Sequence, residues 1–229
     1  MNWAANSVLA SVEPGTGDEC GQVLANNRLT RLATFLLALV VTGPSAYGGA
    51  IQAAQWPQFR GPGGSGVALA GGFPTHFGPD SNLVWKADLP SGHSSPCVWN
   101  NRIFLTGFAD NRLETLCLDR GDGKLLWRRG VQPGKVERSS NLSNPAASTP
   151  ATDGERVYVY FGSFGLICYD LDGQEQWRKP LPTPVTQHGA STSPVVADGR
   201  LILSCDQDTD SFLLALDSRT GQTLWRADR

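Results

Sequence analysis

Three polar side chains stand shortly before Ser-Pro or Thr-Pro dipeptides, where they offer hydrogen-bonding and acid–base chemistry. Asn144 and His188 each fall six positions before a repeated proline, and His93 falls three positions before another. Amide and imidazole groups bind ligands through hydrogen bonds, and a histidine also exchanges protons near neutral pH. These three side chains are therefore candidates for a ligand or cofactor site. The simpler alternative is that they satisfy the peptide groups of their own loops.

Three aspartates alternate in one loop and suggest a second kind of chemistry. Asp206, Asp208 and Asp210 follow a short apolar segment. Carboxylates at every second position are typical of loops that bind hard cations such as Ca²⁺. The glycine and the distal glutamate of an EF-hand are missing, because an apolar run begins at Phe212. A metal site and a solvated turn held by aspartate hydrogen bonds are both open, and the turn is the simpler interpretation.

The remaining reactive groups show no catalytic spacing. No G-x-S-x-G motif is present, and Lys135, Glu137 and Arg138 form a charged cluster in a long loop, for which we expect a solvated face. The cysteines after residue 50 show no C-x-x-C spacing, and we expect small buried side chains at Cys97, Cys117, Cys168 and Cys205.

A hairpin pattern that occurs three times indicates which elements position these loops. Each copy has an apolar strand that ends in aspartate, a glycine turn, and a strand that contains tryptophan. The pattern predicts structural roles for Asp119, Gly123 and Trp127, for Asp172, Gly173 and Trp177, and for Asp217, Gly221 and Trp225. A partial copy at residues 83–86 ends in Trp85-Lys86, and we expect an outer strand over residues 83–89.

Each hairpin is preceded by a second one, which completes a four-stranded unit. A Ser-Pro or Thr-Pro dipeptide opens a short strand, and an Asx turn leads to an apolar strand at residues 102–105, 156–161 and 200–203. The tryptophans at 85, 127, 177 and 225 give periods of 42, 50 and 48 residues. Four short antiparallel strands at this period predict an all-β fold of β-propeller blades, whereas a β-sandwich would not repeat one signature.

The repeated Asp-Gly-Trp signature resembles the tryptophan-docking repeat of the pyrroloquinoline-quinone (PQQ) propellers. That superfamily includes quinoprotein alcohol dehydrogenases and BamB-like secreted proteins, and the segment Trp56-Pro57-Gln58-Phe59-Arg60-Gly61-Pro62 is similar to the start of secreted bacterial members. The resemblance implies a closed ring of seven or eight blades, of which this chain supplies about three and one orphan strand, as an N-terminal fragment. It implies that Trp127, Trp177 and Trp225 pack on neighbouring blades.

The same resemblance makes PQQ with Ca²⁺ a candidate cofactor. Quinoprotein alcohol dehydrogenases typically carry a vicinal cysteine pair against the quinone, and no adjacent cysteines occur in this sequence. The departure from the pattern favours a protein without catalytic residues of its own.

The N-terminal part predicts export. Arg28 and Arg31 precede an uncharged apolar run at residues 32–41, and small residues follow, as in a cleavable secretory signal at about residues 28–50. Ten apolar residues are too few to span a bilayer, so no permanent membrane span is expected. We therefore divide the chain into an extension with the signal (1–50), a Gly/Pro-rich arm (51–81) and incomplete propeller blades (82–229).

These observations predict a periplasmic or extracellular binding or scaffold module with a protein partner or small ligand at the propeller mouth. The formal net charge of −2 gives no basic surface for nucleic acid. Two alternatives stay open, namely the N-terminal part of a PQQ-dependent alcohol dehydrogenase and a propeller that binds carbohydrate or another polymer.

Overall fold

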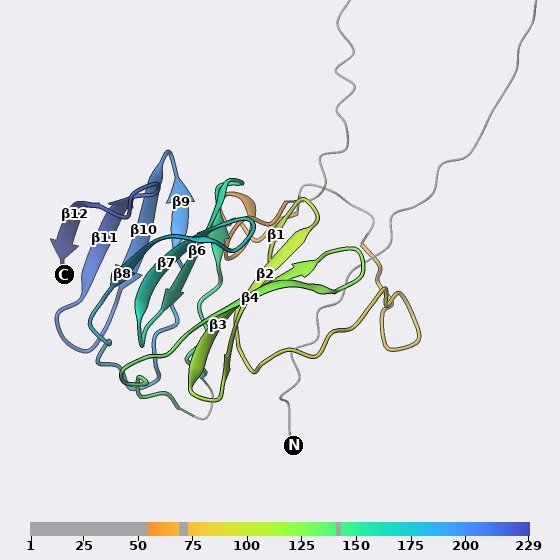
Figure 1. Cartoon of the computed structure of the whole chain (residues 1–229), viewed down its shortest axis with the longest axis horizontal. Coiled ribbons are helices and arrows are strands. Elements are labelled where there is room, and N and C mark those ends of the chain that lie inside the picture. Colours follow the sequence, from red (N-terminus) through yellow and green to blue (C-terminus); the bar gives the residue numbers. More distant parts are fainter. Residues whose placement is uncertain (1–54, 69–72, 141–142) are drawn as a thin grey trace, which may run out of the picture.

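Three antiparallel sheets of four strands each form the folded part of the chain, and they lie side by side in sequence order (Figure 1). The computed structural model describes residues 55–68, 73–140 and 143–229. In each sheet the four strands are hydrogen-bonded in the order in which the chain makes them. The prediction of four-stranded propeller blades is confirmed.

The strands match the predicted hairpins closely. Blade 1 contains β1 (Cys97–Trp99), β2 (Arg102–Ala109), β3 (Arg112–Asp119) and β4 (Leu125–Val131). Blade 2 contains β5 (Ala151–Thr152), β6 (Arg156–Phe161), β7 (Gly165–Asp170) and β8 (Glu175–Pro180). Blade 3 contains β9 (Val195–Ala197), β10 (Arg200–Cys205), β11 (Phe212–Asp217) and β12 (Thr223–Asp228).

The first turn of each blade uses residues that tolerate a left-handed backbone. Asn100 and Asp198 have φ values of 51° and 48°, and Gly154 has a φ of 91°. Asparagine, aspartate and glycine adopt this region at low cost, and such turns match the twist of the strands that they join. The Asx turns that separate the short first strand from the apolar second strand are therefore set by local sequence.

A β-bulge lies at the same place in every blade. The register between the third and fourth strands shifts between Cys117 and Leu118, between Cys168 and Tyr169, and between Ala215 and Leu216. In each case the residue just before the tryptophan of the fourth strand is the extra one. A bulge bends the strand and redirects the next side chain, so it helps to turn each tryptophan toward the following blade.

The apolar core lies between the blades. One buried cluster joins Phe104 and Cys117 of blade 1 to Val157 and Ile167 of blade 2. A second joins Tyr158 and other residues of blade 2 to blade 3, through Leu203 and Leu214 among others. Because each sheet has apolar side chains on both faces, a blade is stable only when neighbours cover it.

The expected outer strand at residues 83–89 is not a strand in this structure. These residues are extended without a regular ladder, yet Trp85 is buried against Ile103, Leu105 and other residues of blade 1. A strand requires a hydrogen-bonded partner strand, and no described strand lies beside this segment. Side-chain burial and a hydrogen bond from the Trp85 indole N–H to the Arg120 carbonyl therefore hold it.

The arm before the blades pairs with their innermost strands. The backbone N–H and C=O of Trp56 bond to Val98 of β1, and the Pro57 carbonyl accepts from the Thr152 N–H of β5, each at 2.8 Å. A short 3₁₀ turn, η1 (Pro62–Gly64), follows.

The predicted secretory signal at residues 28–50 lies outside the described residues. Within the described part of the chain, no helix has the length and apolar character that crossing a membrane requires.

Candidate functional site

One end of the three blades carries the loops that the sequence singled out, and we call residues 90–94, 130–140, 143–148 and 180–192 the mouth. Ser91 pairs with Phe108 at the end of β2, and the His93 N–H donates to the Ala146 carbonyl at 2.9 Å. The Leu181 N–H donates to the Phe164 carbonyl in the turn after β6. The mouth loops are thus bonded to the blades and to one another.

The structure brings together only part of the predicted His93, Asn144 and His188 cluster. The Asn144 amide donates to the Ser91 hydroxyl at 3.1 Å and accepts from the Ala146 N–H at 2.8 Å, so its carbonyl and amino groups both hold the loop. His93 is on the adjoining loop and is exposed, and His188 is exposed on the third loop. The Asn144 side chain thus holds loop structure, and a ligand site at these three residues stays a prediction.

Glu137 is buried, which corrects the expectation of a solvated Lys135–Glu137–Arg138 face. Only 4% of Glu137 is exposed, whereas Lys135 and Arg138 are exposed as expected. The Glu137 carboxylate accepts from the Ala190 N–H at 2.6 Å, and its own N–H donates to the Ser163 hydroxyl at 2.9 Å. Burial raises the pKa of the Glu137 carboxyl, and the bonds from Ala190 and Ser163 act in the opposite direction.

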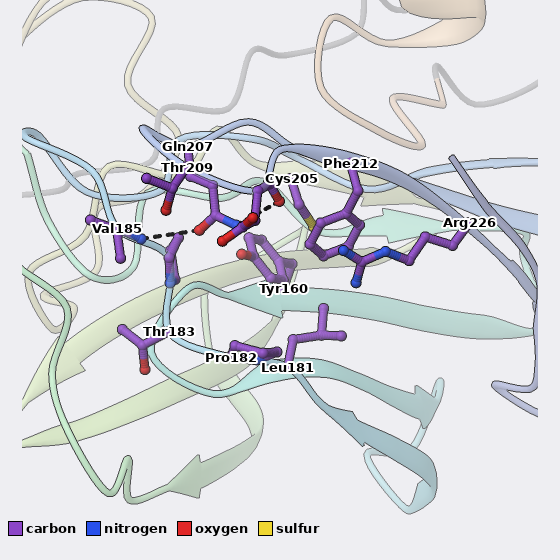
Figure 2. A pocket seen from close by; sticks show the side chains of 12 residues that line it. Tyr160, Leu181, Pro182, Thr183, Val185, Cys205, Gln207, Thr209, Phe212 and Arg226 are labelled. Carbon is purple, nitrogen blue, oxygen red and sulfur yellow. Dashed lines mark hydrogen bonds between the residues drawn. The ribbon is translucent and has the colours of Figure 1, made fainter. Parts of the chain in front are cut away.

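Two hollows flank the loop at residues 181–190. A cavity of about 200 Å³ lies between blades 2 and 3, with Tyr160, Cys205 and Phe212 among its lining residues (Figure 2). The Arg226 guanidinium lies 3.8 Å from the centre of the Phe212 ring. A more open hollow of about 570 Å³ lies between this loop and Lys135–Arg138.

The three aspartates of the proposed metal loop do not converge. Asp206 accepts from the Ser204 hydroxyl and pairs with Arg229 at 2.8 Å, while the Asp208 N–H bonds the Val185 carbonyl. Among the described residues, no group of three histidine, cysteine or acidic side chains is arranged to hold a metal ion. The loop is an ordinary turn in which Asp210 adopts a φ of 55°.

The described residues do not fit PQQ with Ca²⁺. The four cysteines among the described residues are free and buried in separate strands, and burial raises the pKa of Cys117 to about 12 and that of Cys205 to about 11. A buried thiol with a raised pKa is unreactive. At the mouth Asn144 and Glu137 hold loop backbone, and His93 and His188 are exposed on different loops, so we derive no redox step.

The tryptophans hold neighbouring blades together through glycine turns. Trp127 donates its indole N–H to the Leu171 carbonyl at 2.8 Å, and a Cβ on Gly173 would lie 2.6 Å from its ring. Trp177 makes the equivalent contacts with Ser218 and Gly221. Only glycine permits such close approach, and each of these glycines also has a positive φ.

Trp85 and Trp225 differ in whether they make this contact with a glycine turn. Trp85 donates to the Arg120 carbonyl and packs on Gly123, so the partial copy at residues 83–86 makes the same contact as the full repeats. Trp225 is 45% exposed, and nothing in the described part of the chain covers it as blade 3 covers Trp177.

Asp170, rather than Asp172, is the turn aspartate of blade 2. Asp170 accepts from the N–H groups of Asp172 and Gln174, as Asp119 and Asp217 accept from N–H groups in their own turns. Asp172 instead pairs with Arg102 of blade 1 at 2.8 Å. The blade 2 turn is one residue shorter between its aspartate and its glycine than the other two turns. For this reason the sequence pattern assigned the role to Asp172 instead of Asp170.

A set of hydroxyl bonds between blades was missed by the sequence analysis. The Ser95 N–H donates to the Thr149 hydroxyl, and the Thr149 N–H donates to the Ser193 hydroxyl, each at 3.0 Å. The residue before each repeated proline thus joins one blade to the next near the innermost strands. The repeated Ser-Pro and Thr-Pro dipeptides were the available signal.

Comparisons with known proteins agree with this architecture. The model of the family described as outer membrane protein assembly factor BamB matches residues 114–229. Quinohemoprotein alcohol dehydrogenase ADH IIB of Pseudomonas putida is 25% identical over 150 residues, which cover 63% of this chain and 21% of that protein. Outer membrane protein assembly factor BamB of Alkalilimnicola ehrlichii is 32% identical over 148 residues, which cover 60% and 33%.

Solved structures give the same two kinds of match. Quinohemoprotein alcohol dehydrogenase ADHIIG from Pseudomonas putida HK5 aligns with a TM-score of 0.48 at 23% identity, over 64% of this chain and 22% of that chain. BamB from Moraxella catarrhalis aligns with a TM-score of 0.45 at 21% identity, over 64% and 39%.

The chain spans about a fifth to a third of the length of the two curated relatives. The family model covers just over half of the chain and falls on the blades with the Asp-Gly-Trp hairpins. The chain therefore belongs to the PQQ-type repeat family that is described as outer membrane protein assembly factor BamB.

Proposed function

We propose that this chain is part of an exported repeat propeller that acts as a binding or scaffold module, with a protein partner at the mouth. The observation that carries the proposal is the bonding of the mouth loops. Asn144, Glu137 and Gln207 use their side chains to fix loop backbone, as the bonds to Ala146, Ala190 and Val185 show.

A surface fixed in this way suits recognition. Loops that are already ordered lose little conformational entropy on binding, so more of the contact energy appears as affinity. The exposed groups at the mouth include Lys135, Arg138, Gln187 and His188, which offer donors of both charged and neutral kinds. Relatives named as outer membrane protein assembly factors support a protein partner in the cell envelope.

Site-specific photo-crosslinking in the native cells tests this proposal. A photoreactive residue at the exposed Gln187 position should give a discrete protein adduct, because that position is at the mouth. The matched control is the exposed Glu155, which lies beside the β5–β6 turn at the opposite end of blade 2. Equal crosslinking at both positions, or none at Gln187 in the full-length protein, would contradict the proposal.

A second candidate function is the N-terminal part of a quinone-dependent alcohol dehydrogenase. The similarity to quinohemoprotein alcohol dehydrogenase ADH IIB favours it. The test is titration of the full-length protein with PQQ and Ca²⁺, followed by a dye-linked alcohol oxidation assay. Saturable Ca²⁺-dependent quinone binding together with turnover would replace the scaffold proposal, and the lack of both would leave it in place.

A further inference from the structure

The cavity of about 200 Å³ between blades 2 and 3 lies beside the mouth and is largely apolar (Figure 2). Its buried lining consists of Tyr160 of β6, Cys205 of β10 and Phe212 of β11. One wall is the segment at residues 181–185, which contains a leucine, a valine and two prolines. An apolar cavity of about 150 Å³ is large enough for benzene, so this one has room for a ring with a small substituent.

The buried lining contains one polar group without a partner. Tyr160 is 3% exposed, and its hydroxyl makes no hydrogen bond to any residue that the structure describes. Tyr158, two positions earlier in the same strand, instead donates to the Asp153 carboxylate at 2.6 Å. Burial raises the pKa of Tyr160, so its hydroxyl stays a neutral donor. Because a buried hydroxyl without an acceptor is costly, the cavity suits an occupant that supplies one.

The Tyr160 hydroxyl is placed so that an occupant of the cavity reaches it. Figure 2 shows the Tyr160 ring near Cys205 and Phe212, with the hydroxyl oxygen pointing away from them toward the side of Thr183 and Val185. A second cavity of about 260 Å³ shares Tyr160 and Cys205 with the first. A ligand can therefore place an oxygen against the hydroxyl while its apolar part lies against the wall.

The charges around the cavity balance, and its amide side chain is already used. Gln207 accepts from the Val185 N–H at 3.1 Å and donates to the Asp210 carbonyl at 3.0 Å (Figure 2). The lining contains one cation, Arg226, and one carboxylate, Asp210, and both are exposed at the rim. Arg226 also pairs with Asp228 at 2.7 Å. A charged ligand would lose its hydration without gaining a free counter-charge, so a neutral one fits better.

We propose that this cavity binds a small neutral molecule with an apolar body of about the size of one ring and a carbonyl oxygen, which accepts a hydrogen bond from Tyr160. The walls select the size of the ligand, and the hydroxyl fixes its orientation. The inference concerns a cavity between two blades and stands whether or not a protein partner binds at the mouth.

Ligand-observed NMR titration of the full-length protein with two probes of similar shape tests this site. Acetophenone has a ring and a carbonyl oxygen, and α-methylstyrene has a CH₂ group in place of that oxygen. We expect acetophenone to bind saturably. Tyr160→Phe should weaken its binding by about fivefold or more, because the buried carbonyl loses its donor. The same substitution should not weaken the binding of α-methylstyrene, which has no acceptor.

Tyr158→Phe is the matched control. Its hydroxyl is bonded to Asp153, so its removal should leave the affinity for both probes unchanged. The proposal is overturned if acetophenone does not saturate the protein, if Tyr160→Phe changes the affinity for both probes equally, or if Tyr158→Phe weakens acetophenone as much as Tyr160→Phe does.

Urea unfolding without a probe gives an independent measurement. Tyr160→Phe removes a hydroxyl that has no partner among the described residues, so its midpoint should equal or exceed that of the wild type. Tyr158→Phe loses the bond to Asp153 and should unfold at a lower urea concentration. A midpoint for Tyr160→Phe that is lowered as much as that of Tyr158→Phe would show that the Tyr160 hydroxyl is already satisfied, and would also overturn the proposal.

Discussion

At the scale of single residues, one aspartate fixes each Trp hairpin. The Asp217 carboxylate accepts from the N–H groups of Arg219 and Thr220 and from the Thr220 hydroxyl, at 2.8–3.0 Å. Asp119 and Asp170 accept from N–H groups in their own turns in the same way. These bonds satisfy turn amides that lack a strand partner, which is why aspartate suits the position.

We expect Asp170→Ala and Asp172→Ala to differ strongly in stability. Asp170→Ala removes an ionised acceptor from two backbone N–H groups and should lower the free energy of unfolding by about 1–2 kcal/mol. Asp172→Ala removes an ion pair whose Asp side chain is 76% exposed and should cost less than about 0.5 kcal/mol. Urea unfolding of both variants measures this, and equal losses would contradict the assignment of Asp170 to the turn.

The acid sensitivity of the blade 3 turn follows from Asp217. Hydrogen bonds from Thr220 and Arg219 hold the pKa of Asp217 below its ordinary value of 3.8. A lowered pKa stabilises the fold above the ordinary value, and this contribution is lost as the pH falls through the folded-state pKa. NMR titration of the side-chain carboxyl should therefore show a midpoint below 3.8, and a midpoint at or above it would refute the role of these bonds.

At the scale of elements, each outer strand combines a bulge with a docked tryptophan. The extra residue before the tryptophan is exposed, as at Leu126, while Trp127 is only 7% exposed. Leu126 and Trp127 are successive apolar residues, yet only the indole is buried. The docked indole also bonds the turn of the next blade, so it adds direction to apolar burial.

Substitution of Trp127 and of Leu126 should show this contrast. Trp127→Ala opens a cavity between blades 1 and 2 and should lower the free energy of unfolding by about 3–5 kcal/mol. Leu126→Ala changes an exposed side chain and should cost less than about 0.5 kcal/mol. Chemical denaturation measures both, and a loss below about 1 kcal/mol for Trp127→Ala would mean that the indole does not join the blades.

Two substitutions at Thr149 test the hydrogen bonds that hydroxyl groups accept between blades. Thr149→Val keeps the shape but removes the acceptor for the Ser95 N–H, and Thr149 is buried. A buried donor without a partner should cost about 1–3 kcal/mol. Thr149→Ser keeps the oxygen and should be less destabilised than the valine variant. If the two variants unfold at the same urea concentration, the hydrogen bond contributes nothing measurable.

At the scale of the whole molecule, the cores belong to pairs of blades. Blade 2 contributes to both apolar clusters, so it cannot unfold without exposing the facing surfaces of blades 1 and 3. Nearest-neighbour interfaces of this kind give repeat proteins their cooperativity. The closed ring of seven or eight blades stays a prediction. In such a ring a further blade would cover Trp225 and Leu224 of β12, which are exposed here.

The buried thiols provide a test of this cooperativity. Blade 1 has Cys97 and Cys117, blade 2 has Cys168 and blade 3 has Cys205, and all four are buried. Pulsed thiol labelling in rising urea, read by mass spectrometry, should find all four unreactive in the native state and reactive in a single transition. Labelling of one blade at a clearly lower urea concentration would show that the blades unfold independently.

The sequence by itself determined the blades. Turn residues such as Asn100 and Gly221, the alternation of apolar residues and the tryptophan period are local, so hairpins and their spacing were predictable without knowledge of distant contacts. The role of Trp127 and Gly173 was expected from the repeat, and the structure places them in contact. Asn144 bonds its own loop and Ser91, while His93 and His188 are exposed, so a ligand site at these three residues stays a prediction.

Only the tertiary structure decided the features that depend on segments far apart in the chain. Glu137 looked solvated in sequence, yet Ser163 and Ala190 bury it, and they lie 26 and 53 positions away. The bond from Ser95 to Thr149 spans 54 positions, and residues 83–89 have no described partner strand although Trp85 is buried. Turn chemistry is encoded locally, whereas the burial of a charge depends on which loops the blades bring together, because solvent is excluded only when all of them meet.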